Sequence, residues 1–168
     1  MTTLQLADNI YPPLHLHDTV TQALDLMAEF KTKFLPVTSE DKYLGLINEE
    51  SINEENNKEN TTLEKFQEYL IVTAVNAASH FLKAASISNL YQTNVIPVTN
   101  ENNELLGTIS SGALTTALGN FCGAEEYGAL IVMEIERIRF SISEINSIIE
   151  SDGATILHFN VSPHPVPE

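Results

Sequence analysis

The chain has 168 residues, of which 43% are hydrophobic and 18% are charged. This composition can bury a core and differs from that of a disordered chain. Eight Lys and Arg stand against 23 Asp and Glu, which gives a formal net charge of -15. So strong a negative charge repels nucleic acids and anionic membranes at long range. We therefore expect a folded protein of one or two domains that binds no nucleic acid.

Neither a membrane segment nor a signal peptide is expected. No apolar run approaches the ~20 residues that cross a bilayer, and the start, "MTTLQLADNIYPP", lacks the basic and apolar parts of a signal peptide. The single cysteine, Cys122, cannot form an internal disulfide, which is typical of a reducing compartment. We expect a cytoplasmic protein, with Cys122 as a small buried hydrophobe rather than a nucleophile.

Two stretches of the chain look like copies of one another: "FLPVTSEDKYLGLI" from Phe34 and "VIPVTNENNELLGTI" from Val95. Pro97 follows Pro36 by 61 positions (97 − 36), and Gly107 follows Gly45 by 62 (107 − 45). The second copy therefore has one extra turn residue. A repeat of this length indicates one structural unit present twice.

The first copy predicts a helix followed by two strands. Apolar residues recur at helical spacing in "DTVTQALDLMAEF", and Thr19 with Gln22 forms a capping box. The segments "FLPV" and "YLGLI" predict short strands around the polar turn "TSEDK".

The second copy repeats this order. It predicts a helix over "NAASHFLKAASISNLY", strands at "VIPV" and "LLGTI", and a closing helix at "SSGALTTAL". The apolar segments "PPLHLH" and "YLIV" lead into the two predicted helices. Between the copies lies a polar linker that ends in a short helix, with Thr61 and Glu64 as a second capping box. We expect separate packing units joined by a solvated bridge.

In each copy the middle strand carries the pattern h-P-V and the last strand h-h-G-h-h, where h is a hydrophobic residue. With this order of elements, the chain resembles a CBS domain pair over roughly Leu4 to Leu118. The resemblance implies an α/β (α+β) fold in which two small units pack by their sheets into a pseudo-symmetric pair. It assigns residues 1–60 to the first unit with its linker and 61–122 to the second. It also implies a homodimer whose clefts bind an adenosine-type ligand, such as an adenine nucleotide or S-adenosylmethionine.

In the family, ligand binding uses a motif after the last strand, G-h-h-[T/S]-x-x-D, whose Asp accepts from both ribose hydroxyls. The first copy reads "GLINEES", with Asn48 at the hydroxyl position and Ser51 at the Asp position. The second reads "GTISSGA", with Ser110 and Ala113 there. Neither copy has the carboxylate, and losing a charge-assisted hydrogen bond costs roughly 1.5–3 kcal/mol. We therefore expect weak binding.

The resemblance places the ligand in the cleft between the units, with backbone groups of the second copy on the base and the serines after its last strand on the sugar or phosphate. The candidate binding residues in the two copies are Asn94, Val95, Ile96, Ser110, Ser111, Asn48 and Ser51. The alternative is that the small residues after the last strand only cap the closing helix.

The C-terminal part predicts a β-α-β unit over residues 127–163. "GALIVMEIE" and "ATILHFNV" read as strands around a helix in "SISEINSIIESDG". This order resembles the first half of an ACT domain, and its place after the pair is similar to acetoin-utilisation-type CBS proteins. Because two strands alone leave exposed edges and little core, we expect the unit to pair across a dimer or the chain to be a truncated form of a longer protein.

The function that we predict is regulatory and non-catalytic. The chain has no phosphate-binding glycine motif, no H-E-x-x-H and no G-x-S-x-G. His15 and His17 share one face of a predicted strand but have no third ligand beside them, so we expect neither a catalytic nor a metal site. Two alternatives stay open: a structural dimerisation scaffold with filled clefts, and an amino-acid sensor that uses the ACT-like unit. The regulated partner is not indicated.

Overall fold

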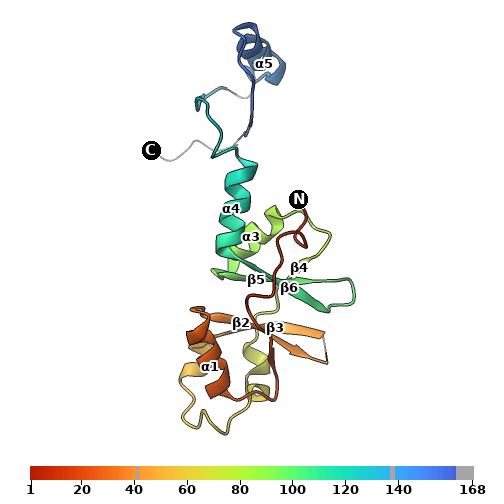
Figure 1. Cartoon of the computed structure of the whole chain (residues 1–168), viewed down its shortest axis with the longest axis vertical. Coiled ribbons are helices and arrows are strands. Elements are labelled where there is room, and N and C mark those ends of the chain that lie inside the picture. Colours follow the sequence, from red (N-terminus) through yellow and green to blue (C-terminus); the bar gives the residue numbers. More distant parts are fainter. Residues whose placement is uncertain (41, 137–138, 162–168) are drawn as a thin grey trace. The chain divides into compact units, whose positions relative to one another are not determined.

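The two sequence repeats fold into two three-stranded sheets with the same strand order (Figure 1). In each sheet a two-residue strand runs parallel to the middle strand, and the middle strand pairs antiparallel with the last. The strands are β1 (Leu14–His15), β2 (Phe34–Ser39) and β3 (Lys42–Asn48), then β4 (Val75–Asn76), β5 (Val95–Thr99) and β6 (Leu105–Ser110). We call residues 14–53 the first copy and residues 75–117 the second copy.

The computed structural model describes residues 1–40, 42–136 and 139–161. The chain divides into two compact units, residues 1–117 and 118–168. The first unit holds both copies. Five helical segments belong to it or begin in it: α1 (Val20–Glu29), α2 (Glu49–Asn53), the 3-10 helix η1 (Leu63–Tyr69), α3 (Leu82–Tyr91) and α4 (Ser111–Phe121).

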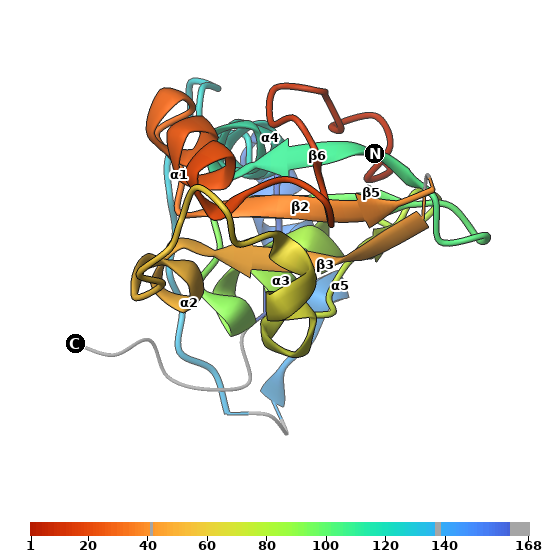
Figure 2. The ribbon, with the colours of Figure 1, turned by 90° about the horizontal axis from the view of Figure 1, so that it is seen from below.

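The sheets of the two copies face one another, and the helices lie on the outer sides. In Figure 1, α1, α2 and η1 lie on the far side of the first sheet, and α3 and α4 lie on the far side of the second. Figure 2 shows α1, α2 and η1 in front of the first sheet when the molecule is seen from below. The first sheet buries its apolar face against these helices, and its core consists of Leu14, Val20, Ala23, Met27, Leu35, Val37, Ile47, Ile52, Leu63 and Phe66.

The capping box predicted for α1 is confirmed. The backbone N–H of Gln22 donates to Thr19 Oγ1 at 3.2 Å, and the N–H of Thr19 donates to Gln22 Oε1 at 2.7 Å. The second box, at Thr61 and Glu64, is wrong, because η1 begins after Thr62, whose side chain makes no capping hydrogen bond. The helix of the second copy is shorter than predicted, since β4 takes up the start of the segment and α3 begins only at Leu82.

The segment that leads into each copy crosses over and pairs with the sheet of the other copy. Asp8 and Thr108 exchange two backbone hydrogen bonds, of 2.9 and 2.8 Å, which cover the edge of β6. Ile71 and Leu46 do the same at 2.9 and 3.0 Å on the edge of β3. The prediction that the two copies are separate packing units is therefore wrong, because both lie in one compact unit and each covers a strand edge of the other.

The glycine that both copies share lies at these two crossings. Gly107 has φ +149°, and a Cβ built on it would lie 2.6 Å from the carbonyl oxygen of Asp8. A Cβ on Gly45 would lie 2.8 Å from the Cβ of Leu70, beside Ile71. The h-h-G-h-h pattern of the last strand thus reflects a close approach of two backbones.

The hairpin turn of the second copy also contacts the first sheet. Lys42 Nζ donates to Glu104 Oε1 and to the carbonyl oxygen of Asn102, both at 2.9 Å. Asn103, in a left-handed conformation with φ +59°, donates from Nδ2 to the carbonyl oxygen of Tyr43 at 2.7 Å. Hydrogen bonds from Asn100 and then from Lys42 hold the pKa of the Glu104 carboxyl below its usual range.

Tyr43 ties β3 to the segment that enters the second copy. Its hydroxyl donates to the carbonyl oxygen of Thr73 at 2.7 Å, and the side chain is almost completely buried. Burial raises the pKa of Tyr43 above its usual range, so the hydroxyl stays protonated and remains a donor.

The unit of residues 118–168 contains helix α5 (Ile142–Ser151), as predicted. Ser141 caps it by accepting from the N–H of Glu144 at 3.3 Å, and Gly153 follows it with φ +77°. The flanking strands of the predicted ACT-like unit, residues 127–163, are wrong as far as the chain is described, because residues 128–136 and 154–161 belong to no strand. In a split β-α-β arrangement a third strand lies between the two strands that flank the helix. The described residues of this unit form no such strand.

Side chains of this unit are largely exposed. Tyr127 is 102% and Leu130 is 92% exposed, while Ile145 of α5 is buried. The rings of Phe140 and Phe159 stack with centroids 6.3 Å apart and connect the segments before and after α5. Cys122 is exposed, so its predicted burial is wrong.

Replacing Gly107 by Ala should lower the free energy of unfolding by about 2 kcal/mol or more, because the new Cβ meets the backbone of Asp8 and cannot be relieved by moving a side chain. Urea unfolding followed by circular dichroism measures it. The control is Gly112→Ala in α4, where the nearest atom is 3.8 Å away; it should stabilise by up to about 1 kcal/mol. Equal destabilisation by both variants would contradict the crossing.

Tyr43→Phe should cost about 1–3 kcal/mol in the free energy of unfolding, because the carbonyl of Thr73 loses its buried donor. Tyr69→Phe is the matched control, since Tyr69 is 61% exposed, and it should change stability by less than about 0.5 kcal/mol. A neutral Tyr43→Phe would show that water satisfies this carbonyl.

Candidate functional site

A cleft of about 360 Å³ opens between the two copies. Three parts of the chain form its walls. The first copy contributes the start of β2, the end of β3 and the start of α2, the segment that pairs with β3 contributes Ile71, and the second copy contributes the C-terminal end of α3. The lining residues are Lys33, Phe34, Asn48, Glu49, Glu50, Ile71, Tyr91 and Gln92. The cleft is thus built by both copies together.

The turn after β3 positions the polar wall of the cleft. Asn48 caps α2, with its Oδ1 accepting from the N–H of Ser51 at 2.6 Å. The N–H of Glu49 donates to the carbonyl oxygen of Lys33 at 2.9 Å. These bonds place the carboxylates of Glu49 and Glu50 in the first turn of α2, beside the cleft. Among the described residues, Asn48 Nδ2 has no hydrogen-bond partner and remains available as a donor.

The opposite wall is the end of α3. Gln92 ends this helix in the left-handed conformation, with φ +50°, and its Nε2 donates to the carbonyl oxygen of Asn89 at 2.6 Å. The left-handed turn brings Tyr91 and Gln92 to the cleft. Lys31, 61 positions earlier (92 − 31), has the same conformation after α1, which shows how closely the two copies correspond.

Of the seven residues predicted to bind a ligand, only Asn48 lines the cleft. Ser51 serves α2 through its backbone N–H. Ser110 Oγ accepts from the N–H of Ala113 at 3.1 Å, and the N–H of Ser111 donates to the carbonyl oxygen of Asn94 at 3.0 Å. These groups after the last strand of the second copy thus hold the start of α4.

The polar groups of the segment predicted to contact a base, Asn94 to Ile96, also make hydrogen bonds within the protein. Val95 and Ile96 are fully buried and lie in the ladder of β5 with β6. The N–H of Val95 donates to Thr93 Oγ1 at 3.2 Å. Asn94 accepts from Thr32 Oγ1 at 3.1 Å, which links the second copy to the first.

Sequence reasoning missed seven of the eight cleft residues, of which five come from segments other than the turn that holds Asn48: Lys33, Phe34, Ile71, Tyr91 and Gln92. A signal was present at the turn after β3, where "INEE" places two carboxylates next to the motif. The wall contributed by Tyr91 and Gln92 could be found only by superposing the two copies.

The cleft combines apolar side chains with polar groups of both charges. Phe34, Ile71 and Tyr91 offer surface for a flat ring, whereas the carboxylates of Glu49 and Glu50 accept hydrogen bonds and Lys33 is the one cation among the lining residues. This arrangement fits a ring that carries hydroxyl groups. It fits a highly charged phosphate poorly, because the carboxylates outnumber the ammonium group.

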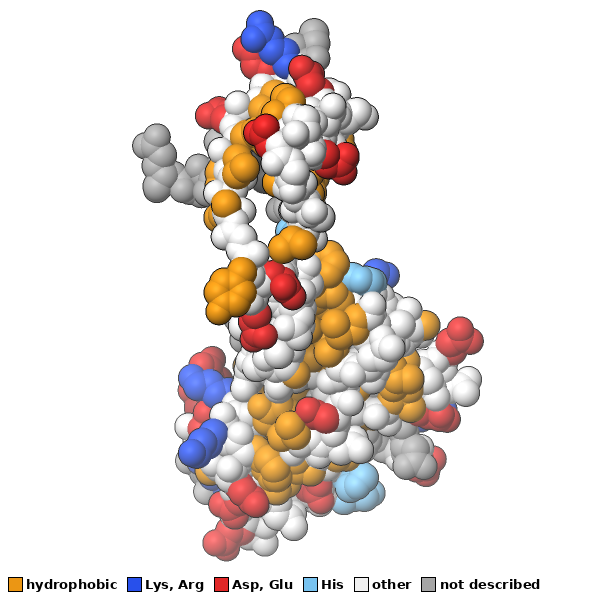
Figure 3. Space-filling view, turned by 45° about the horizontal axis from the view of Figure 1, so that its top comes forward, with side chains coloured by type: hydrophobic (Ala, Val, Ile, Leu, Met, Phe, Trp, Pro, Cys, Tyr) orange, Lys and Arg blue, Asp and Glu red, His pale blue; other side chains and the backbone are white. Residues whose placement is uncertain are grey.

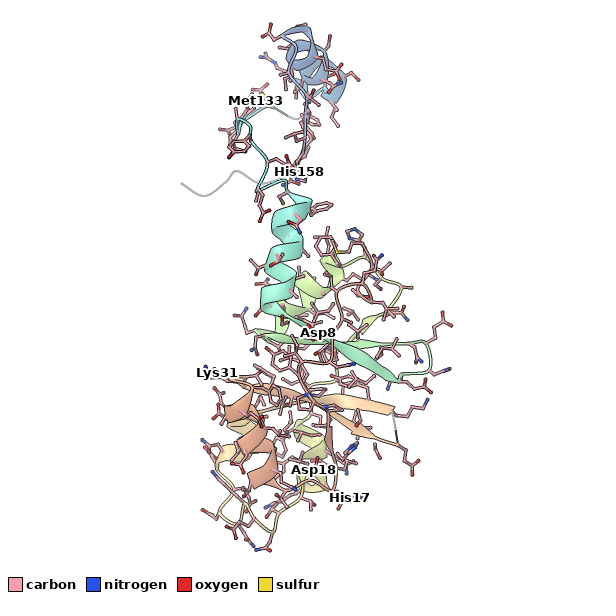
Figure 4. All side chains as sticks on the ribbon, viewed as in Figure 1. Asp8, His17, Asp18, Lys31, Met133 and His158 are labelled. Carbon is pink, nitrogen blue, oxygen red and sulfur yellow. The ribbon has the colours of Figure 1, made fainter. Side chains whose placement is uncertain are left out.

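The two histidines considered as metal ligands, His15 and His17, lie beside side chains of other segments. His15 Nδ1 lies 3.3 Å from Thr38 Oγ1, and His17 Nδ1 lies 3.2 Å from Glu64 Oε1. In Figure 4, His17 and Asp18 lie at the outer end of the first copy, while Asp8 lies near the second sheet. Within the part of the chain that the structure describes, no three His, Cys, Asp or Glu side chains could together hold a metal ion.

No helix among the described residues has the length and apolar character needed to cross a bilayer.

One family model matches part of the chain. Residues 9–56 match the family model of the CBS domain, which covers the first copy. No curated protein matches the chain.

Solved structures match the pair. A CBS domain pair/ACT domain protein from Thermotoga maritima is 18% identical, with a TM-score of 0.64 over 71% of this chain and 98% of that one. A putative signal-transduction protein with CBS domains from Burkholderia ambifaria is 20% identical, with a TM-score of 0.56 over 76% and 98%. CBSX2 in complex with AMP is 18% identical, with a TM-score of 0.54 over 71% and 96%. The predicted fold class is confirmed: the chain has the mixed α/β fold of a CBS domain pair.

Proposed function

We propose that the chain is a non-catalytic regulatory module that binds an adenosine-type ligand weakly in the cleft between its two copies. The observation that carries the proposal is the cleft itself, whose walls come from both copies. A ligand that touches both walls favours one arrangement of the copies over others, and such differential binding is what a regulatory module needs. One solved neighbour, CBSX2, is in complex with AMP.

The lining residues suggest how such a ligand is held. The base packs on Phe34, Ile71 and Tyr91, and Asn48 Nδ2 donates to it or to the sugar. The ribose hydroxyls donate to Glu49 or Glu50, which lie two and one positions before the site of the missing family Asp. A carboxylate accepts two hydroxyls well. Ser110, Ser111 and the segment from Asn94 to Ile96 are a less favourable site, because their polar groups already serve the helix cap and the sheet.

Charge selects among adenosine compounds. The carboxylates of Glu49 and Glu50 repel phosphates, and Lys33 offsets only part of that repulsion. Adenosine, AMP and S-adenosylmethionine should therefore bind better than ATP.

The proposal also includes a homodimer, with unit bounds of 1–60 and 61–122 in each chain. It includes a cytoplasmic location, because the exposed thiol of Cys122 suits a reducing compartment.

One alternative function has a specific observation in its favour. In both copies the residues after the last strand are used as helix caps, at Asn48 and Ser110. If the cleft binds nothing, the pair is a structural scaffold. The amino-acid sensor has no such support, because residues 128–136 and 154–161 form no strand.

A thermal-shift titration with adenosine, AMP, ATP and S-adenosylmethionine should give a saturable rise in melting temperature for all but ATP, because binding to the folded state alone stabilises it. Tyr91→Ala should weaken the binding by roughly tenfold, by removing one wall for the base. The matched control, Tyr127→Ala, removes an exposed ring from outside residues 1–117 and should change nothing.

No shift with any of these compounds, even with Mg²⁺ to offset phosphate repulsion, would reject the sensor and favour the scaffold. Equal loss from both tyrosine variants would place the ligand elsewhere.

A further inference from the structure

The segment between α4 and α5 is apolar but belongs to no strand. It reads "GALIVMEIE" over residues 128–136. Within the described part of the chain, the backbone of residues 127–135 makes no hydrogen bond with other backbone groups. Figure 3 shows hydrophobic side chains, in orange, exposed on the unit of residues 118–168, and Figure 4 places Met133 on this segment. An apolar segment whose backbone groups are unpaired is a ready template for pairing with another chain.

Alternate side chains of this segment differ in chemistry and in exposure. One set is wholly apolar and becomes less exposed along the chain, from 63% at Ile131 through 48% at Met133 to 37% at Ile135. The other set includes Val132, at 74%, and ends in the exposed acids Glu134 and Glu136. A period of two, with one side apolar and the other polar, is the pattern of a strand that has one covered face.

The charges of this unit are almost all negative. Residues 118–168 contain eight Asp and Glu against two Arg, and residues 118–136 contain no Lys or Arg. The exposed Glu136 Oε2 lies 3.5 Å from Arg139 Nε. Among the described residues, Glu134 has no cation within reach of an ion pair. A partner that pairs with this segment must therefore bring the positive charge that the unit lacks.

We propose that residues 129–136 bind, as an added strand, an extended segment of a partner protein in which basic and apolar residues alternate. Backbone hydrogen bonds between the two strands hold the partner, and its side chains determine the fit. Residues opposite one another in a strand pair project to the same face. Lys or Arg of the partner then meets Glu134 and Glu136, while its apolar residues extend the face formed by Ile131, Met133 and Ile135.

The charges favour such a partner over a second copy of this chain. A second copy would bring its own Glu134 and Glu136 with no Lys or Arg in the same segment, and two chains of net charge -15 repel one another. A basic partner is instead attracted, so its binding should weaken as salt rises. The inference is independent of the cleft between the two copies, because it concerns only the unit of residues 118–168.

Fluorescence anisotropy with the full chain and two labelled peptides tests the proposal. The probe is acetyl-Lys-Val-Lys-Ile-Lys-Val-Lys-amide, and the control, acetyl-Lys-Lys-Val-Ile-Val-Lys-Lys-amide, has the same composition without the alternation. We expect the probe to bind saturably and the control to bind about tenfold more weakly, because only the probe places its charges and its apolar side chains on opposite faces of a strand. Equal binding of the two peptides, or no binding of the probe at millimolar concentration, would overturn the proposal.

Charge reversal locates the binding on the chain. Glu134→Lys combined with Glu136→Lys should weaken binding of the probe by about tenfold, because like charges then lie opposite one another. The matched control combines Glu54→Lys with Glu59→Lys, at exposed acids of the first unit, and changes the net charge by the same amount. At about 0.15 M salt it should alter binding by less than about twofold. Equal weakening by both pairs would show attraction to the net charge alone and would overturn the site.

Proline tests the backbone pairing without changing charge. Successive N–H groups of a strand point to opposite edges, so one of the variants Val132→Pro and Met133→Pro removes a hydrogen bond to the partner and should weaken binding by about tenfold. Circular dichroism checks that both variants stay folded. Unchanged binding by both would overturn strand addition. If sedimentation velocity without peptide showed self-association that either proline variant abolishes, a second copy would be the occupant and the basic partner would be excluded.

Discussion

The backbone pairing at the two crossings is the constraint on which the rest of the first unit depends. Asp8 bonds to Thr108 and Ile71 bonds to Leu46, so the open edge of each sheet is covered by the segment that leads into the other copy. Because Gly45 and Gly107 have no Cβ, the backbones can approach this closely. The crossing also places Ile71 in the cleft, so the candidate site depends on this backbone pairing.

The sequence predicted those parts of the fold that local pattern determines. The repeat predicted the strand pairs β2–β3 and β5–β6, and the capping box at Thr19 predicted the start of α1. The crossings could not be predicted, because backbone pairing between Asp8 and Thr108 leaves no pattern of side chains in the sequence. The sequence shows Gly107, but it does not show which backbone segment lies against it. The strands predicted around α5 failed for a related reason, since an apolar segment becomes a strand only where another strand pairs with it.

The candidate site, too, could be predicted only in part from the sequence. Asn48 was found from a motif, whereas Lys33, Ile71 and Tyr91 meet it only through tertiary structure. The motif residues of the second copy, foremost Ser110, act as helix caps. The family motif of the first copy thus lies at the cleft, and local hydrogen bonds decide which of its groups remain available as donors or acceptors.

The two copies share a fold and differ in what they expose. The first copy contributes the carboxylates of the cleft, while the second contributes a wall of the cleft and outer helices whose one charged residue is Lys83.

Native-state amide hydrogen exchange, measured for each residue by NMR, is the most direct test of the backbone pairing between the copies. The account predicts that the amides of Asp8, Leu46, Ile71 and Thr108, all hydrogen-bonded across the copies, exchange slowly and open together with the core strands β2 and β5. Rapid exchange at Asp8 and Ile71, with β2 and β5 still protected, would show that the copies are independent units and would contradict the account.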